Sequence, residues 1–262
     1  MDSLKRRPRN TKAKGQCLFC SGSVTKEHIF AQWVDDALPP SPSDVTYKAS
    51  YTPFTLPNQK STKITTNKQG DVTVIFVRKA CKSCNEGWMR LLDEAASEFF
   101  PAMMSGLEQT LTVEQMISLA RWASLKSALI DAKTPEFTSV SRSDCEEMKE
   151  YQMPPKSWVI WLGRCPTKIR QVGTEHRCRK YFRPDGVMER AQSTTIRLGE
   201  LVLFCACSPD PNMIEALRLA NRSRALTEIW PKSPTGTMIW PTSVNRMSEE
   251  AFWRLCDVIG NL

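Results

Sequence analysis

The chain has 262 residues, a formal net charge of +8 at pH 7 and 41% hydrophobic residues. This length is enough for one large domain or two small ones, each with a hydrophobic core. The positive charge favours a polyanionic partner such as nucleic acid. No apolar segment follows the basic start, and none reaches the roughly 18 residues of a membrane span, so we expect neither a signal peptide nor a transmembrane helix. We expect a cytoplasmic protein whose ten cysteines stay reduced.

The first 15 residues are basic and lack apolar periodicity, which predicts a flexible tail. They contain six cations and one acid, namely Lys5, Arg6, Arg7, Arg9, Lys12, Lys14 and Asp2. Two interpretations are open from the sequence. The segment is either a solvated leader or an arm that lies on the phosphates of a nucleic acid.

Two C-x-x-C pairs follow, Cys17 with Cys20 and Cys81 with Cys84. Four thiolates at this spacing are the ligand set of a tetrahedral structural zinc site. The alternative is four ordinary core cysteines, and the duplicated spacing disfavours it. The other six cysteines have no ligand spacing and are expected to be buried apolar residues. They are Cys145, Cys165, Cys178, Cys205, Cys207 and Cys256.

The long segment between the two cysteine pairs is expected to contain one well-defined strand. Residues 35–70 are rich in Pro, Ser, Thr and Lys, and they predict an extended loop or a weak hairpin. Such a long loop is often functional, and it could be a surface that contacts substrate. Residues 71–77 are mostly β-branched and predict a strand that leads into the second pair.

Three helices are expected after the second cysteine pair. From Glu86 onward, apolar residues recur at three- and four-residue spacing until Pro101 interrupts the helix. A capping box that begins at Thr112 opens a second helix. A third, short helix is expected around residues 144–151.

Beyond Pro154 and Pro155 the pattern predicts strands, two helices and no catalytic constellation. The expected strands are residues 157–162, 175–182, 194–207, 229–230 and 238–240. The expected helices are residues 211–221 and 248–255, the second with a serine cap.

Three residues close to the cysteine pairs have the chemistry of a phosphodiesterase site. Histidine ordinarily titrates near neutrality, so His28 can accept a proton from water. Glu27 offers the hard oxygen that Mg²⁺ or Mn²⁺ prefers. Asn85 directly follows the second pair, where it could cap the helix or bind a metal. Because neighbours on a strand point to opposite faces, Glu27 and His28 can share one site only if the backbone twists or bulges.

These motifs resemble the HNH endonucleases. The resemblance rests on the first C-x-x-C pair, on Thr-Lys-Glu-His-Ile-Phe from residue 25, and on Cys-Lys-Ser-Cys-Asn-Glu-Gly-Trp-Met from residue 81. It covers residues 17–92 and is closest to a bacterial and phage branch whose second pair continues as Cys-Asn-x-Gly-Trp-Met. It implies a ββα-metal fold, in which a hairpin carries the histidine, a helix carries the last motif residue, and zinc holds the two together.

Carried over by position, the resemblance implies that His28 is the general base that activates water against the phosphodiester. Asn85 and Glu27 would bind the catalytic Mg²⁺ or Mn²⁺, which would offset charge on the leaving 3′ oxygen and leave a 5′-phosphate. The middle asparagine of the family pattern has no clear equivalent, since Asn67 and Asn58 stand at the wrong distance. The proline that often follows the histidine is also absent.

Basic side chains flank the expected site and would contact nucleic-acid phosphates without regard to sequence. They are Arg78, Lys79, Lys82 and Arg90. The second histidine, His176, is expected to be a satisfied or exposed strand residue rather than a catalytic one. Trp88 is expected to pack its helix against the zinc-binding region.

Together these patterns predict an α+β chain with a ββα-metal (HNH) nuclease domain stabilised by zinc, a helical segment and a C-terminal mixed α+β module. The expected parts are a basic tail (1–15), the nuclease domain (16–110), a helical connector (111–152) and the module (153–262).

The expected function is metal-dependent hydrolysis of DNA, in a mobile-element or anti-phage defence system where a partner such as an ATPase could gate the activity. Two alternatives stay open: a non-catalytic zinc-stabilised module that binds nucleic acid, and a subunit of a larger complex.

Overall fold

The computed structural model describes residues 15–39, 46–52, 64–69, 75–133, 138–166, 172–182, 186–220, 226–231, 235–241 and 246–256. The expected basic tail therefore lies outside the described residues, apart from Gly15. The chain is a mixed α+β protein, as its sequence predicts. No helix in the described ranges is both long enough and apolar enough to cross a membrane.

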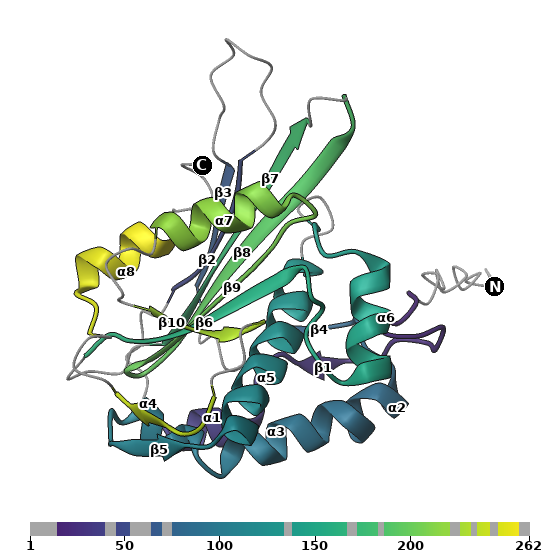
Figure 1. Cartoon of the computed structure of the whole chain (residues 1–262). Helices are drawn as coiled ribbons and strands as arrows, with labels where there is room; N and C mark the ends of the chain where they lie inside the picture. The colour runs from purple at the N-terminus through teal and green to yellow at the C-terminus, as the bar shows by residue number, and fades with distance from the viewer. Residues whose placement is uncertain are drawn as a thin grey trace, which may run out of the picture.

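A seven-stranded sheet forms the centre of the molecule (Figure 1). Its strand order is β10-β6-β9-β8-β7-β2-β3, and all neighbours are antiparallel except β2 and β7, which are parallel. The strands are β2 (Thr46–Thr52), β3 (Ile64–Gln69), β6 (Trp158–Arg164), β7 (Val172–Phe182), β8 (Met188–Leu198), β9 (Leu201–Cys207) and β10 (Leu226–Trp230).

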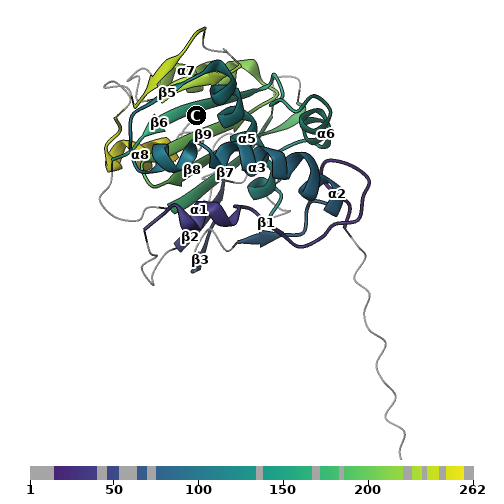
Figure 2. The same ribbon diagram turned by 90° about the horizontal axis from the view of Figure 1, so that it is seen from below.

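Helices cover both faces of this sheet, as Figures 1 and 2 show. α7 and α8 lie on one face, whereas α5 lies on the other with α3 and the N-terminal elements beyond it. The helices are α1 (Gln32–Asp36), α2 (Lys82–Cys84), the π-helical turn η2 (Asn85–Met89), α3 (Arg90–Ser97), α4 (Phe100–Met104), α5 (Val113–Asp131), α6 (Arg142–Tyr151), α7 (Pro211–Ala220) and α8 (Glu249–Cys256).

Strand β9 illustrates why its sequence is apolar throughout. Side chains alternate between the two faces of a strand. Leu203 and Cys205 belong to the core on the α5 side, whereas Val202 and Phe204 belong to the core under α7 and α8. Both faces of the strand are therefore buried, and Cys207 ends it as a core residue. This confirms that the cysteines of β9 are apolar strand residues.

The longest helix, α5, crosses the middle of the molecule. Its first turn is closed by the predicted capping box, in which the Gln115 backbone N–H donates to Thr112 Oγ1 and the Thr112 N–H donates to Gln115 Oε1. Every residue from Trp122 to Asp131 is buried. A helix buried on all sides belongs to the interior of a protein. The segment predicted as a connector is thus a central element of the core.

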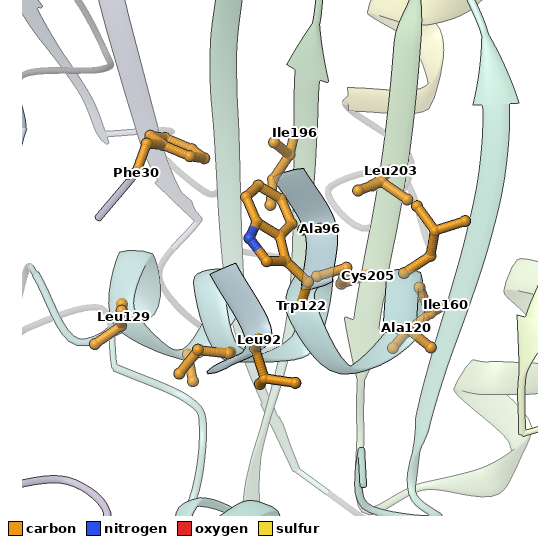
Figure 3. Packing of buried hydrophobic residues seen from close by; sticks show 14 of the residues in the cluster. Phe30, Leu92, Ala96, Ala120, Trp122, Leu129, Ile160, Ile196, Leu203 and Cys205 are labelled. Atoms are coloured by element: carbon orange, nitrogen blue, oxygen red, sulfur yellow. The ribbon is translucent and has the colours of Figure 1, made fainter. Parts of the chain in front are cut away.

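Trp122 of α5 packs between α3 and the large sheet (Figure 3). Its indole lies 5.1 Å from the ring of Phe100 and 5.9 Å from that of Phe30, measured between centroids. Figure 3 labels further members of the same cluster from α3 and the sheet, namely Leu92, Ala96, Ile160, Ile196, Leu203 and Cys205. Truncating a buried tryptophan typically lowers the free energy of unfolding by about 3–5 kcal/mol. The packing of Trp122 therefore contributes strongly to holding the layers together.

Two short sheets complete the fold. β1 (Glu27–His28) pairs antiparallel with β4 (Phe76–Val77), and β5 (Gln109–Leu111) pairs antiparallel with β11 (Met238–Trp240). The second pair joins residues more than a hundred positions apart, so the C-terminal part of the chain is fastened to the part before α5.

Two expectations for strands need refinement. Residues 194–207 were expected as one strand, which is wrong, because Gly199 has a φ of +60° and turns the chain into the hairpin β8–β9. Within residues 35–70, β2 and β3 form the expected hairpin, and β2 also joins the large sheet beside β7. Residues 71–74 of the next expected strand lie outside the described residues, and β4 is its described end.

One hydrophobic cluster runs through all three expected domains. It includes Phe19 near the first cysteine pair, Trp122 in α5 and Leu203 in β9. This cluster therefore joins parts of all three expected domains, and the boundaries after residues 110 and 152 stay predictions from sequence.

Candidate functional site

Four cysteines from two distant segments come together. The sulfur atoms of Cys17, Cys20, Cys81 and Cys84 all lie within 4.8 Å of one another. Cys20 Sγ is 3.5 Å from Cys81 Sγ and 3.7 Å from Cys84 Sγ. Tetrahedral zinc with Zn–S bonds of about 2.3 Å requires S···S separations of about 3.8 Å. The cluster therefore has the size that a zinc ion needs.

The backbone around the cysteines also suits metal-bound thiolates. The N–H groups of Phe19 and Gly22 lie 3.4 Å from Cys17 Sγ and Cys20 Sγ respectively, and both donate to sulfur. A Cβ atom on Gly22 would lie 2.9 Å from both Cβ and Sγ of Cys81. Glycine is needed here because the first turn approaches the second so closely.

Thiol acidity differs across the cluster. Burial raises the pKa of Cys17 and of Cys84 above the ordinary value of 9.0. Burial also opposes ionisation of Cys81, but hydrogen bonds from the Ser83 side chain and the Cys84 backbone outweigh it and lower the pKa of Cys81 to about 6. Four thiolates this close repel one another strongly unless a cation lies between them. The four residues could hold a zinc ion, which would supply that charge.

The first cysteine turn is fastened to the second by backbone hydrogen bonds. The Leu18 N–H donates to the Lys79 carbonyl over 2.8 Å, and the Thr25 N–H donates to the Ala80 carbonyl over 2.9 Å. Arg142 at the start of α6 adds a bond to the carbonyl of Cys17. These contacts fix the end of the β1–β4 pair that lies next to the cysteines.

The antiparallel pair β1–β4 directs Glu27 and His28 to opposite sides. Glu27 is paired with Val77 and His28 with Phe76. Glu27 and Val77 are buried, whereas His28 and Phe76 are exposed. The strand therefore alternates normally. The structure brings the two residues to one strand without placing their side chains on one face.

Glu27 is buried and interacts electrostatically with a partly buried ion pair between two helices. Lys126 of α5 is 1% exposed, and its Nζ lies 2.8 Å from Oδ1 and 2.9 Å from Oδ2 of Asp93 in α3. Trp122 Nε1 donates to the same carboxylate over 2.8 Å. Burial raises the pKa of Glu27 to about 7, while the charge of Lys126 opposes this rise. Glu27 Oε2 has no hydrogen-bond partner within the described part of the chain.

Asn85 begins the π-helical turn η2 immediately after the last cysteine. Its N–H donates to the Cys81 carbonyl over 3.0 Å, so the second cysteine turn runs directly into the helix. Gly87 interrupts this turn with φ −96° and ψ −117°, and a Cβ there would meet nothing within 4 Å. Asn85 therefore lies at a locally irregular and open helix start.

Trp88 packs the helix against the cysteine turn, as predicted. Its ring lies edge-on to Phe19, with centroids 5.2 Å apart and an interplanar angle of 81°. Phe19 stands between the two cysteines of the first pair. This contact packs η2 against the first cysteine turn.

The four expected phosphate-binding residues lie on one continuous stretch of chain from β4 to α3. Arg78, Lys82 and Arg90 are exposed and Lys79 is half-buried. Lys82 Nζ lies 3.7 Å from the Glu86 carboxylate, and Arg90 contacts Glu94. Exposed pairs of this kind contribute little, so a phosphate can replace the acidic partner.

Two residues near His28 were not singled out from the sequence. Phe76 is the cross-strand partner of His28 and is 48% exposed, and Lys26 Nζ lies 4.0 Å from the centre of its ring. Only the pairing of β1 with β4 reveals this arrangement, because the two segments are about fifty residues apart.

His176 is a buried strand residue with one side-chain hydrogen bond, so its burial fits the expected structural role. It is 2% exposed, its Nδ1 lies 2.9 Å from Thr194 Oγ1, and its Nε2 lies 3.1 Å from Asp131 Oδ1, an ion-pair distance without hydrogen-bond geometry. The six scattered cysteines are all buried and lie outside the four-cysteine cluster.

Comparison of the chain with protein-family models, curated proteins and solved structures found no match. The resemblance to HNH endonucleases therefore rests on the sequence motifs, and the structure adds that the four cysteines lie close together.

Proposed function

We propose that the chain is a metal-dependent HNH endonuclease that hydrolyses phosphodiester bonds of DNA. The observation that carries the proposal is the order of elements around the four-cysteine cluster. β1, which carries His28, pairs antiparallel with β4, although α1, β2 and β3 lie between them in the chain, and β4 runs through Cys81 and Cys84 directly into the helical turn that begins at Asn85. A strand pair followed by a helix, with cysteines before β1 and between β4 and the helix, supplies the elements that a ββα-metal nuclease requires.

The chemistry proposed for His28 is general-base catalysis. Its imidazole accepts a proton from water, the water oxygen attacks phosphorus, and the bond from phosphorus to the 3′ oxygen breaks. The 3′ oxygen takes up a proton, so the products are a 3′-hydroxyl and a 5′-phosphate. The exposure of His28 supports this role, since a base must reach both water and a large substrate.

The proposed ligands of Mg²⁺ or Mn²⁺ are Glu27 and Asn85. One observation fits a cation near Glu27, namely that its Oε2 is buried without a hydrogen-bond partner among the described residues. A bound cation would neutralise charge that develops on the leaving oxygen. Zinc at the four cysteines would hold the hairpin and the helix start together without taking part in the reaction.

The direction of Glu27 favours a second candidate function. Its carboxylate lies on the buried side of β1, away from the exposed His28. A zinc-stabilised module that binds nucleic acid without cutting it, alone or as a subunit of a complex, needs no acid and histidine on one face. In both functions the basic residues from Arg78 to Arg90 contact phosphate. A partner such as a defence-system ATPase could gate either activity.

The test is cleavage of supercoiled plasmid by the zinc-loaded chain with added Mg²⁺ or Mn²⁺. Replacing the general base by His28→Ala should lower the rate by about 10²-fold or more, and Asn85→Ala should do so while zinc content stays unchanged. Asn212→Ala is the matched control, since Asn212 is an exposed asparagine in the first turn of α7. Cleavage by His28→Ala at the wild-type rate would contradict the proposal. Binding without cleavage by the wild type would favour the second function.

A further inference from the structure

The outward side of the β1–β4 hairpin places an exposed aromatic ring beside His28. His28 and Phe76 are cross-strand partners, and their neighbours Glu27 and Val77 point inward. Lys26 Nζ lies over the Phe76 ring, 4.0 Å from its centre. We refer to Lys26, His28 and Phe76 as the outer hairpin face. This face combines an aromatic ring, a cation and the proposed general base, and it carries no acidic side chain.

The position of Phe76, rather than its exposure, makes it informative. Single apolar side chains are common on protein surfaces and need no explanation. Phe76, however, stands directly across from the residue that would attack a phosphodiester through water. Cross-strand neighbours in an antiparallel pair have Cβ atoms about 5 Å apart. A nucleotide whose phosphate is at His28 would therefore have its base within reach of the Phe76 ring.

Relative affinities indicate which group the ring would bind. An exposed cation–π contact such as that of Lys26 is worth roughly two- to fivefold in an equilibrium constant. Stacking of a nucleobase on an aromatic side chain is worth roughly five- to 150-fold. A base can thus displace the lysine from the ring. The released ammonium remains beside His28, where a phosphate would attract it, and exposed Arg78 follows in the chain.

We infer that the outer hairpin face binds an unpaired nucleotide, with its base stacked on Phe76 and its phosphate between Lys26 and His28. The inference rests on the proposed function and names its substrate class. Bases inside an intact duplex stack on one another and present no free face unless they are flipped out. The preferred substrate is therefore single-stranded DNA, or duplex DNA that contains unpaired bases.

The first experiment measures binding of the zinc-loaded full chain to labelled oligothymidine of about 20 nucleotides, longer than one typical single-strand site. A duplex of equal length is the second probe, and Mg²⁺ and Mn²⁺ are left out to prevent cleavage. Phe76→Leu should weaken binding of the single strand roughly tenfold and leave duplex binding unchanged. Phe76→Trp, which keeps an aromatic face, should bind the single strand as well as the wild type.

Phe182→Leu is the matched control, because Phe182 is 46% exposed and lies on β7. It should bind both probes as the wild type does. Undiminished single-strand binding by Phe76→Leu would overturn the inference. An equal loss on the duplex would overturn it as well, since stacking distinguishes the two probes.

Lys26→Gln tests the phosphate contact. It should weaken binding to both probes and reduce the slope of log affinity against log salt by about one. An unchanged slope would show that Lys26 does not contact phosphate, which overturns that part of the inference.

Cleavage assays separate this inference from the proposed function. A chain that binds the oligomer through Phe76 but cuts no DNA contradicts the endonuclease and leaves the inference standing. A chain that cuts single strands and plasmid alike, at rates that Phe76→Leu does not change, supports the endonuclease and overturns the inference.

Discussion

At Glu27 the chain buries a carboxylate beside one ammonium that already has a partner. Lys126 is held by Asp93, so the two acids share a single cation inside the protein. Removing a charge from water costs several kcal/mol unless an opposite charge compensates fully. The protonated form of Glu27 is favoured for this reason, and its pKa rises from 4.5 to about 7.

This shift predicts a pH dependence of folding. The folded chain holds the Glu27 proton more tightly than the unfolded chain, so the stabilising contribution is complete below about pH 4.5 and is lost as the pH rises through 7. In Glu27→Gln this loss should vanish. Urea unfolding in zinc-containing buffer without Mg²⁺ or Mn²⁺ should show the variant gaining up to about 3 kcal/mol on the wild type between pH 5 and 8. The pH dependence that comes from the zinc ligands is the same in both proteins and cancels in the comparison. Parallel curves of unfolding free energy against pH for the two proteins would contradict the raised pKa of Glu27.

The four-cysteine cluster gives a second prediction at single residues. Cys81→Ser should lower bound zinc from about one ion per chain to near zero, because a three-cysteine site with one hydroxyl binds zinc far more weakly. Cys145→Ser is the matched control, since Cys145 is 2% exposed and lies outside the cluster. It should lose some stability and keep its zinc. Metal analysis of the purified proteins decides, and equal zinc in the two variants would argue against the cluster as a zinc site.

Among the elements, the β8–β9 hairpin depends on one glycine. Gly199 has a φ of +60°, and a Cβ there would overlap the carbonyl oxygen of Met104. The turn is therefore fixed both by backbone conformation and by its contact with the end of α4. The N–H of Glu200, which donates to the same carbonyl over 2.9 Å, strengthens this junction.

Gly199→Ala should thus destabilise the chain by about 3 kcal/mol, the sum of left-handed strain and displaced backbone. Gly186 separates the two causes, because its φ is +81° and no atom of the described residues lies within 4 Å of the position of a Cβ. Gly186→Ala should cost only about 1 kcal/mol. Urea denaturation measures both, and equal losses would show that the contact with Met104 adds nothing.

Local signals in the sequence predicted several elements well. The capping box at Thr112 located α5, and the serine at 248 located α8, where Ser248 Oγ accepts the Ala251 N–H. The β8–β9 turn was missed although Gly199 marks it, because the apolar residues on both sides read as one strand. The direction of each strand pairing, such as that of β2 beside β7, depends on contacts across more than a hundred residues and has no local signal.

The candidate site was predictable in composition and less so in geometry. Spacing alone identified the four cysteines, and they do lie together. The burial of Lys126 was not predictable, since a lysine in a helix is ordinarily exposed and its partner Asp93 comes from another helix. The motifs predicted that Glu27 and His28 serve one site. The two side chains instead lie on opposite faces of β1, as alternation along a strand requires.

At the scale of the whole molecule, α5 makes the expected C-terminal module (153–262) and the part of the chain before it depend on each other. One face of the large sheet is covered by this helix, and the core continues from there to the cysteine turns. Apolar side chains of β6, β8 and β9 on that face are fully buried. They would meet water if residues 153–262 were separated from the rest.

We therefore expect the fragment 153–262 to lack a cooperative unfolding transition, whereas the full chain unfolds in one. Calorimetry and near-ultraviolet circular dichroism would measure this, and the fragment should bind hydrophobic dyes as partly folded states do. The full chain under the same conditions is the control. A sharp transition of the fragment would instead support an independent C-terminal module.

The path of the chain between β1 and β4 has a consequence for synthesis. Between these partners the chain travels to the far edge of the large sheet, where β2 lies beside β7 with Lys48 opposite Glu175. The ribosome synthesises β7 only after it has added more than a hundred residues beyond β2. The two cysteine pairs can meet earlier. Strand β2, which lies between them in the chain, has no β7 to pair with until then. Nascent chains should accordingly acquire zinc before they acquire protection from proteases.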